Sequence, residues 1–111
     1  MEPVKGLLQK DYIEVKIDLD RMTNGNAVAE RLRPSGRGGI PWIVILDPEG
    51  EALITSDGPK GNIGCPVAPE ERSHFMHMIE KTARQMSDQD LTSLKSLLDA
   101  FGEGILGKLK R

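Results

Sequence analysis

The stretch IPWIVILDPEGEALIT, residues 40–55, decides the fold that we expect for this chain. Residues 40–46 form an unbroken apolar run, which is typical of a strand covered on both faces. Asp-Pro-Glu-Gly at 47–50 places Asp, Pro and Gly at the first, second and fourth positions of a type I turn. Residues 51–55 follow as a second strand. We therefore predict an antiparallel hairpin whose first strand lies inside the domain.

The residues before the hairpin predict a strand and a short helix. From Tyr12 to Leu19, apolar and charged side chains alternate strictly, which is the period of a strand with one buried face. Residues 27–32 are rich in helix formers and are followed by Pro34, so we expect a short helix there. Residues 35–39 form a loop on composition, because three of the five are Gly.

The residues after the hairpin predict a long loop and then a helix. Residues 56–69 hold three Gly and three Pro with little periodicity, and loops of that length are commonly functional. A helix is expected to open near Pro69. Phe75, Met78 and Ile79 follow at helical spacing, which predicts a face packed on the sheet.

A last amphipathic helix is expected near the C-terminus. Ser-Asp-Gln-Asp at 87–90 resembles a capping box, and leucines follow it on one stripe. Beyond Gly102, further glycines favour fraying over a stable helix. We therefore divide the chain into a domain at 1–86 and a C-terminal helix with a flexible basic tail at 87–111.

Composition excludes several classes of partner. The chain has 111 residues, enough for one compact domain, and its net charge is −2, without the basic excess of a nucleic-acid-binding protein. No apolar run approaches the roughly 20 residues of a membrane span. The N-terminus lacks the apolar core of a secretory signal. For the chain as written, we expect a soluble, cytoplasmic protein with no cofactor and with no nucleic-acid or membrane partner, whereas a longer precursor would leave the compartment open.

The metal-binding and thiol side chains are few. Cys65 is the single cysteine, which excludes an internal disulfide. It is a lone reactive thiol, an intermolecular cross-link, or a structural cysteine without chemistry. His74 and His77 lie three residues apart, but no third ligand has a recognisable spacing, whereas catalytic zinc normally takes three protein ligands. We expect two solvated histidines and no metal.

The order of the expected elements resembles the second half of the thioredoxin fold, over residues 10–86. Gly39-Ile40-Pro41 fits the position where that family enters a strand through a cis-proline. The resemblance implies an α/β fold: a thioredoxin-like three-layer sandwich, truncated at its N-terminus, with a mixed sheet of about three strands and an extra C-terminal helix. It also implies a relation to thiol-disulfide oxidoreductases.

The chain lacks the half of that fold which carries Cys-x-x-Cys, so we expect no dithiol activity in this form, and whether the chain is an enzyme stays open. Residues 1–10 resemble the tail of the missing helix, although Pro3 and Gly6 disfavour a helix of their own. In the family, the missing strand lies between the strand at 12–19 and the Pro41 strand. Its loss predicts unpaired edges, and hence a homo-oligomer or marginal stability.

Three function classes therefore remain, the third being a single-cysteine redox protein that acts through Cys65. In the first, the chain is a thioredoxin-like domain without dithiol chemistry. In the second, it is a non-catalytic module that binds a peptide or a protein subunit through an exposed strand edge or a groove at Ile40, Pro41 and Trp42, where the family offers its backbone to a peptide. The alternative for these three residues is that the bend completes the fold and Trp42 fills the core.

Overall fold

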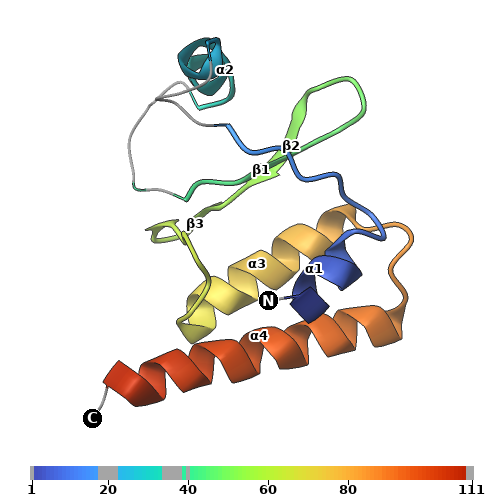
Figure 1. Ribbon diagram of the computed structural model, residues 1–111, viewed down its shortest axis with the longest axis vertical. Coiled ribbons are helices and arrows are strands. Elements are labelled where there is room, and N and C mark those ends of the chain that lie inside the picture. The colour runs from blue at the N-terminus through green and yellow to red at the C-terminus, as the bar shows by residue number, and fades with distance from the viewer. Residues whose placement is uncertain (1, 18–22, 34–38, 40, 110–111) are drawn as a thin grey trace.

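The computed structural model describes residues 2–17, 23–33, 39 and 41–109. Their elements are the helices and strands α1 (Glu2–Leu8), α2 (Gly25–Leu32), β1 (Val44–Leu46), β2 (Ala52–Thr55), β3 (Asp57–Gly58), β4 (Gly61–Asn62), α3 (Pro69–Thr82) and α4 (Asp88–Leu109). Helices α1, α3 and α4 form one layer, the β1–β2 hairpin lies over α3, and α2 lies beyond the hairpin (Figure 1). Among the described helices, none combines the length and apolarity needed to cross a membrane.

The predicted hairpin is confirmed. Strands β1 and β2 pair antiparallel, with Val44 opposite Thr55 and an irregular register near Leu46. The backbone N–H of Gly50 donates to the carbonyl of Asp47 at 3.0 Å, which closes the predicted turn. The Asp47 carboxylate also accepts backbone N–H bonds from Glu49 and Glu51, so the aspartate at the first turn position stabilises the whole turn.

The sheet is smaller than predicted. Strands β1 and β2 form a two-stranded sheet, β3 and β4 form a second one, and the mixed sheet of about three strands is wrong for the described residues. The apolar run ahead of the turn is not covered on both faces either, since Ile43 is 36% exposed and Leu46 is 39% exposed. The helical layer covers one side of the hairpin (Figure 1). Two small sheets of two strands each do not confirm the expected three-layer sandwich.

The strand predicted at 12–19 is wrong over its described part. Residues 12–17 form neither strand nor helix, and residues 18–19 lie outside the described residues. The predicted inner face is exposed: Ile13 by 93%, Val15 by 72% and Ile17 by 38%. Alternation makes a segment suitable for a strand, but a strand also needs a paired partner, and neither described sheet includes residues 12–17.

The hydrophobic core lies mainly between α3 and α4 and beneath the hairpin. Its buried side chains are Ile63, Phe75, Met76, Met78, Ile79, Met86, Leu94 and Leu98. The face predicted for α3 is therefore buried. It packs on α4 more than on the sheet. Leu94 and Met78 are fully buried and come from the two helices, so they lie at the centre of this contact.

Local signals explain where the two long helices begin. The Glu71 carboxylate accepts the backbone N–H groups of Val67 and Ala68 at 3.1 and 2.9 Å, ahead of α3. At α4, the Ser87 hydroxyl accepts the N–H of Asp90, and the Asp90 carboxylate accepts the N–H of Ser87, both at 3.0 Å. The predicted capping box is confirmed, with Asp in place of the usual Glu.

The fraying predicted beyond Gly102 is wrong, because α4 continues to Leu109. Gly102 is buried, and a Cβ added there would lie 2.5 Å from the carbonyl oxygen of Val67 and 2.9 Å from Nε of Arg72. The glycine is therefore a close-packing residue that lets α4 approach the start of α3. A Cβ at Gly104 or Gly107 would meet nothing within 4 Å.

Residues 10–12 attach the end of α1 to the α3–α4 connection. The Asp11 carboxylate accepts the backbone N–H groups of residues 84, 85 and 86, with N···O distances of 2.8–3.0 Å. The Lys10 ammonium contacts both oxygens of Asp90 at 2.9 and 3.0 Å, and the Tyr12 hydroxyl hydrogen-bonds that of Thr82. Helix α1 thus forms despite Pro3 and Gly6, since its apolar side chains pack on the core.

We predict that Gly102→Ala lowers the free energy of unfolding by about 1–3 kcal/mol, because the added methyl group overpacks the contact with residues 67–72. Gly104→Ala and Gly107→Ala are the matched controls, and each is expected to raise stability by up to about 1 kcal/mol through helix propensity alone. Urea denaturation followed by circular dichroism measures all three. Equal effects at the three positions would show that Gly102 is not a packing residue.

Asp11 should make stability depend on pH. Burial opposes ionisation of its carboxyl, but the N–H groups of residues 84–86 outweigh it and hold the pKa below the ordinary value of 3.8. A lowered folded-state pKa means that the stabilisation is complete above the unfolded value and is lost as pH falls through the folded value. Asp11→Asn should therefore cost about 1 kcal/mol near neutral pH, the net worth of partly exposed bonds to a charged group.

The Asp11→Asn cost should be constant above about pH 5. It should shrink as pH falls below the ordinary carboxyl value of 3.8, because the native carboxylate becomes protonated as pH falls through its lowered pKa. Glu49→Gln, at an exposed position of the β1–β2 turn, is the control. A cost that stays constant with pH would contradict the assigned role of the Asp11 charge.

Candidate functional site

The predicted groove residues lie where the chain enters β1. Pro41 is exposed and Trp42 is half-buried. The Trp42 indole N–H donates to the Asp57 carboxylate at 3.1 Å, and the Arg33 guanidinium lies over the ring at 4.9 Å from its centroid, a cation–π distance. Ile40 lies outside the described residues, so the cis Ile40–Pro41 bond stays a prediction.

Asn62 organises this region. Its side-chain NH₂ donates to the carbonyls of Gly39 and Pro41 at 2.8 and 2.9 Å. Its side-chain oxygen accepts the Ser56 hydroxyl at 2.7 Å and the Gly64 N–H at 3.2 Å. All four hydrogen-bonding positions of the amide are therefore used, and β4 is tied to the entry of β1.

Ser56 extends the same network into the core. Its side chain is fully buried, and its hydroxyl accepts the backbone N–H of Ile43 at 2.9 Å. The backbone N–H of Ser56 donates to the Ile43 carbonyl at 2.8 Å. The Pro41 carbonyl and both backbone groups of Ile43 are thus engaged inside the chain. Sequence reasoning missed Asn62 and Ser56, because polar residues in a loop rich in Gly and Pro have no periodicity to single them out.

Cys65 and the two histidines do not come together as a site. Cys65 is exposed in the loop ahead of α3. The Nε2 atom of His74 lies 3.0 Å from the Thr55 carbonyl, and the His74 and His77 ring centroids are 6.3 Å apart. Within the described part of the chain, no three His, Cys, Asp or Glu side chains are arranged to hold a metal ion.

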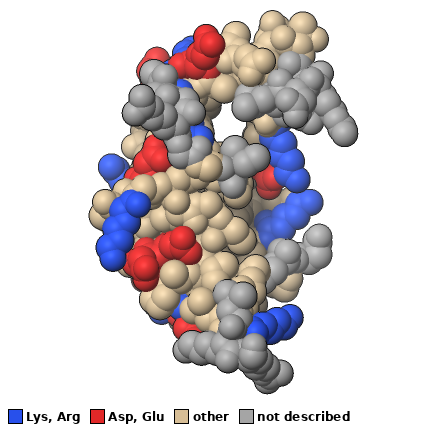
Figure 2. Space-filling view, turned by 90° about the vertical axis from the view of Figure 1, so that its left-hand side faces the viewer, with Lys and Arg blue, Asp and Glu red and all other residues tan. Residues whose placement is uncertain are grey.

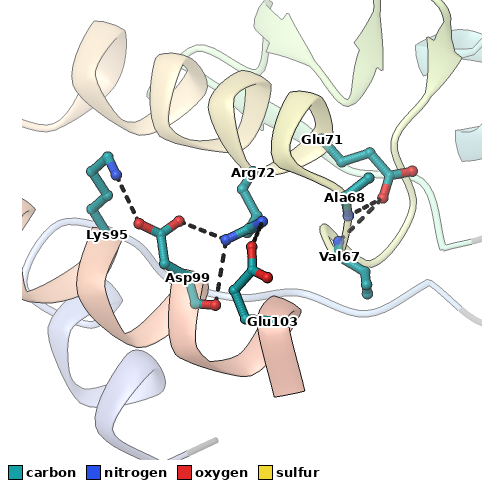
Figure 3. Close-up of polar contacts among 7 residues, drawn as sticks. All are labelled: Val67, Ala68, Glu71, Arg72, Lys95, Asp99 and Glu103. Carbon is teal, nitrogen blue, oxygen red and sulfur yellow. Dashed lines mark hydrogen bonds and ion pairs between the residues drawn. The ribbon is translucent and has the colours of Figure 1, made fainter. Parts of the chain in front are cut away.

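A charged cluster lines a groove of about 720 Å³ between α3 and α4. Arg72 is only 5% exposed, and its guanidinium contacts the Asp99 carboxylate at 2.9 Å and the Glu103 carboxylate at 2.7 Å (Figure 3). The Lys95 ammonium contacts the other Asp99 oxygen at 2.7 Å. Two cations thus face two carboxylates, so the charges of the cluster are internally balanced.

The pKa shifts of this cluster have the same cause. The bond from Lys95, aided by Arg72, holds the pKa of Asp99 below its ordinary value. The bond to Glu103 and the charge of Asp99 raise the pKa of Arg72 above its ordinary value. Both shifts favour the charged forms, which suits an ion-pair tie between helices and leaves Asp99 a poor proton acceptor. The cluster therefore has a structural role.

Several large apolar side chains of the described residues remain exposed, in two segments of the chain. Besides residues 13, 15 and 17, the large exposed apolar side chains of the described residues are Ile43, Leu46 and Leu53 of the hairpin region. On the face shown in Figure 2, basic and acidic side chains are scattered among uncharged ones. Contiguous apolar surface marks interaction sites in soluble proteins, and residues 13, 15 and 17 would share one face if the segment paired as a strand.

Comparisons with known proteins identify no relative: no family model, no curated protein and no solved structure matches the chain.

Asn62 offers a direct test of how the predicted groove is held. Asn62→Ala removes four hydrogen bonds and leaves carbonyl groups of the β1 entry without their partner, so we expect the free energy of unfolding to fall by about 1–3 kcal/mol. The native emission of Trp42, the single tryptophan, should shift to longer wavelength as the ring gains solvent. Asn26→Ala, at an exposed position of α2, is the control. Unchanged stability and emission would contradict the role given to Asn62.

Proposed function

We propose that the chain is a non-catalytic binding module that holds an extended segment of another polypeptide by strand pairing. The observation that carries this proposal is the segment at residues 13–17. It alternates apolar and charged side chains as a strand does, it is exposed, and it is not paired in either described sheet. Unpaired strand-forming backbone is a template for pairing with another chain.

The 13–17 segment is a better candidate than the groove at Ile40, Pro41 and Trp42. Strand pairing needs free backbone N–H and C=O groups. The carbonyl of Pro41 already accepts from Asn62, and the N–H of Ile43 already donates to Ser56. The groove stays a second candidate because Trp42 is only half-buried and presents part of its ring to solvent.

We also propose that this chain is related to thiol-disulfide oxidoreductases. The support for this relation is the order of α2, β1, β2 and α3, which agrees with the expected order of elements over this part of the chain. Two-thiol exchange needs an attacking thiolate and a second, resolving thiol, whereas this chain has Cys65 alone. We therefore propose a domain that resembles those enzymes and binds protein without dithiol activity.

A synthetic strand tests the proposal. The probe is the blocked peptide Lys-Val-Thr-Val-Glu-Val, added to isotope-labelled protein while amide signals are followed by NMR. We expect the signals of residues 13–17 to shift, because the peptide supplies the missing ladder of backbone bonds. The control peptide has Pro in place of the central Val, which removes one donor and should weaken the shifts.

The outcome that would overturn the proposal is an absence of shifts at residues 13–17 up to about 1 mM peptide, which corresponds to a binding free energy weaker than about −4 kcal/mol. Shifts confined to Trp42 and its neighbours would instead favour the groove as the binding surface.

A further inference from the structure

We propose that the partner of the 13–17 segment is the same segment of a second copy of this chain, paired antiparallel with Val15 opposite Val15. This inference rests on the proposed function and names its partner. An antiparallel pair of identical strands has a two-fold axis, which is the commonest symmetry of homodimers. Each copy then supplies the edge that the other lacks.

The charges of the segment fit this register. With Val15 on the axis, Glu14 of each copy lies opposite Lys16 of the other copy, so two pairs of opposite charge form on one face. Both side chains are available, since Lys16 is 89% exposed and Glu14 is 67% exposed, and their contact within the chain is long, at 3.8 Å. On the other face Ile13 lies opposite Ile17, which joins apolar side chains across the pair.

Other registers are disfavoured by the same residues. A shift of one residue brings the apolar face of one strand against the charged face of the other. An antiparallel shift by two places either Lys16 opposite Lys16 or Glu14 opposite Glu14. A parallel pair in register places Glu14 beside Glu14 and Lys16 beside Lys16. Like charges directly opposite each other destabilise a strand pair. The sequence of residues 13–17 therefore specifies one arrangement.

The structure also holds the base of the segment in place. Asp11 and Tyr12 are fixed to the α3–α4 connection, so the chain leaves a rigid support at residue 12. A segment ordered at its base loses less conformational entropy when it pairs. Five residues from each copy form a much smaller interface than a standard one, which buries about 1,600 Å². We therefore expect a weak dimer, visible between roughly 1 µM and roughly 1 mM protein.

Charge exchange at residues 14 and 16 tests the register by analytical ultracentrifugation. Glu14→Lys alone places two lysines opposite each other at both symmetric positions, and Lys16→Glu alone places two glutamates there. Each single variant should weaken the dimer about ten-fold or more, because two attractive pairs become repulsive. The double variant E14K/K16E should restore wild-type association. A mixture of the two single variants should form a heterodimer.

The controls match the changes in net charge. Glu49→Lys and Lys60→Glu alter exposed charges in the turns of the two hairpins, away from the segment. Neither should change the dimer, and their mixture should not form a heterodimer beyond the wild-type level. Single variants at 14 and 16 that associate like wild type, or a mixture that fails to associate, would overturn the proposal.

A cross-link gives a second measurement, which reports the proximity of residue 15 in the two copies instead of the mass of the complex. Opposed residues of an antiparallel pair have Cα atoms about 4.5–5.5 Å apart, within the range that a disulfide spans. In a Cys65→Ser background, Val15→Cys should form an intermolecular disulfide at least about ten times faster than the exposed control Ser73→Cys. Equal rates would overturn the self-pairing.

These results separate the two proposals. A chain that is monomeric at about 1 mM and cross-links no faster than its control, but whose 13–17 signals respond to the strand peptide, binds another protein and not itself. If the peptide response at residues 13–17 is missing too, strand pairing by this segment is refuted, and only shifts at Trp42 and its neighbours would leave the groove as a binding surface.

Discussion

The architecture depends on one carboxylate, that of Asp11, which accepts three successive backbone N–H groups from the connection between α3 and α4. These N–H groups lie where a helix has ended and another has not begun, so they have no partners in a helical ladder. Asp11 satisfies them from a distant part of the sequence. Lys10 and Tyr12 add contacts to Asp90 and Thr82 on either side.

The Asp11 contact decides what happens to the chain on both of its sides. Before it, α1 is held against the core and buries apolar side chains that a free peptide of this length would leave in water. After it, residues 13–17 form an exposed segment in which apolar and charged side chains alternate. A polar anchor followed by an alternating segment that neither described sheet includes supports the proposed binding role, because the anchor limits the disorder that a partner must overcome.

The hairpin and the helices were predictable because the sequence signals that specify them are local. The turn at 47–50, the capping sequence at 87–90 and the helical spacing around Phe75 each act over a few residues. The strand expected at 12–19 failed because alternation reports suitability for pairing, whereas the pair itself needs a second strand far away in the sequence. The continuation of α4 past Gly102 was missed for a similar reason, since close packing against Val67 outweighs the local preference of glycine.

In the candidate site, too, local features were predictable and contacts between distant parts of the sequence were not. Trp42 was predicted from its neighbours, but the bonds that hold its region come from Asn62, about twenty residues away, and have no sequence pattern. Asp11 reaches Arg84 across 73 positions, and Arg72 reaches Glu103 across 31. Contacts of this kind depend on the tertiary fold, so residue type alone does not indicate them.

The most direct test of the account is an isotope-filtered NMR experiment on an equal mixture of labelled and unlabelled wild-type chain, which detects only contacts between copies. Self-pairing of residues 13–17 predicts intermolecular contacts from Ile13 to Ile17 and from Val15 to Val15. Intermolecular contacts confined to other surfaces, such as the hairpin residues Leu46 and Leu53, would contradict it.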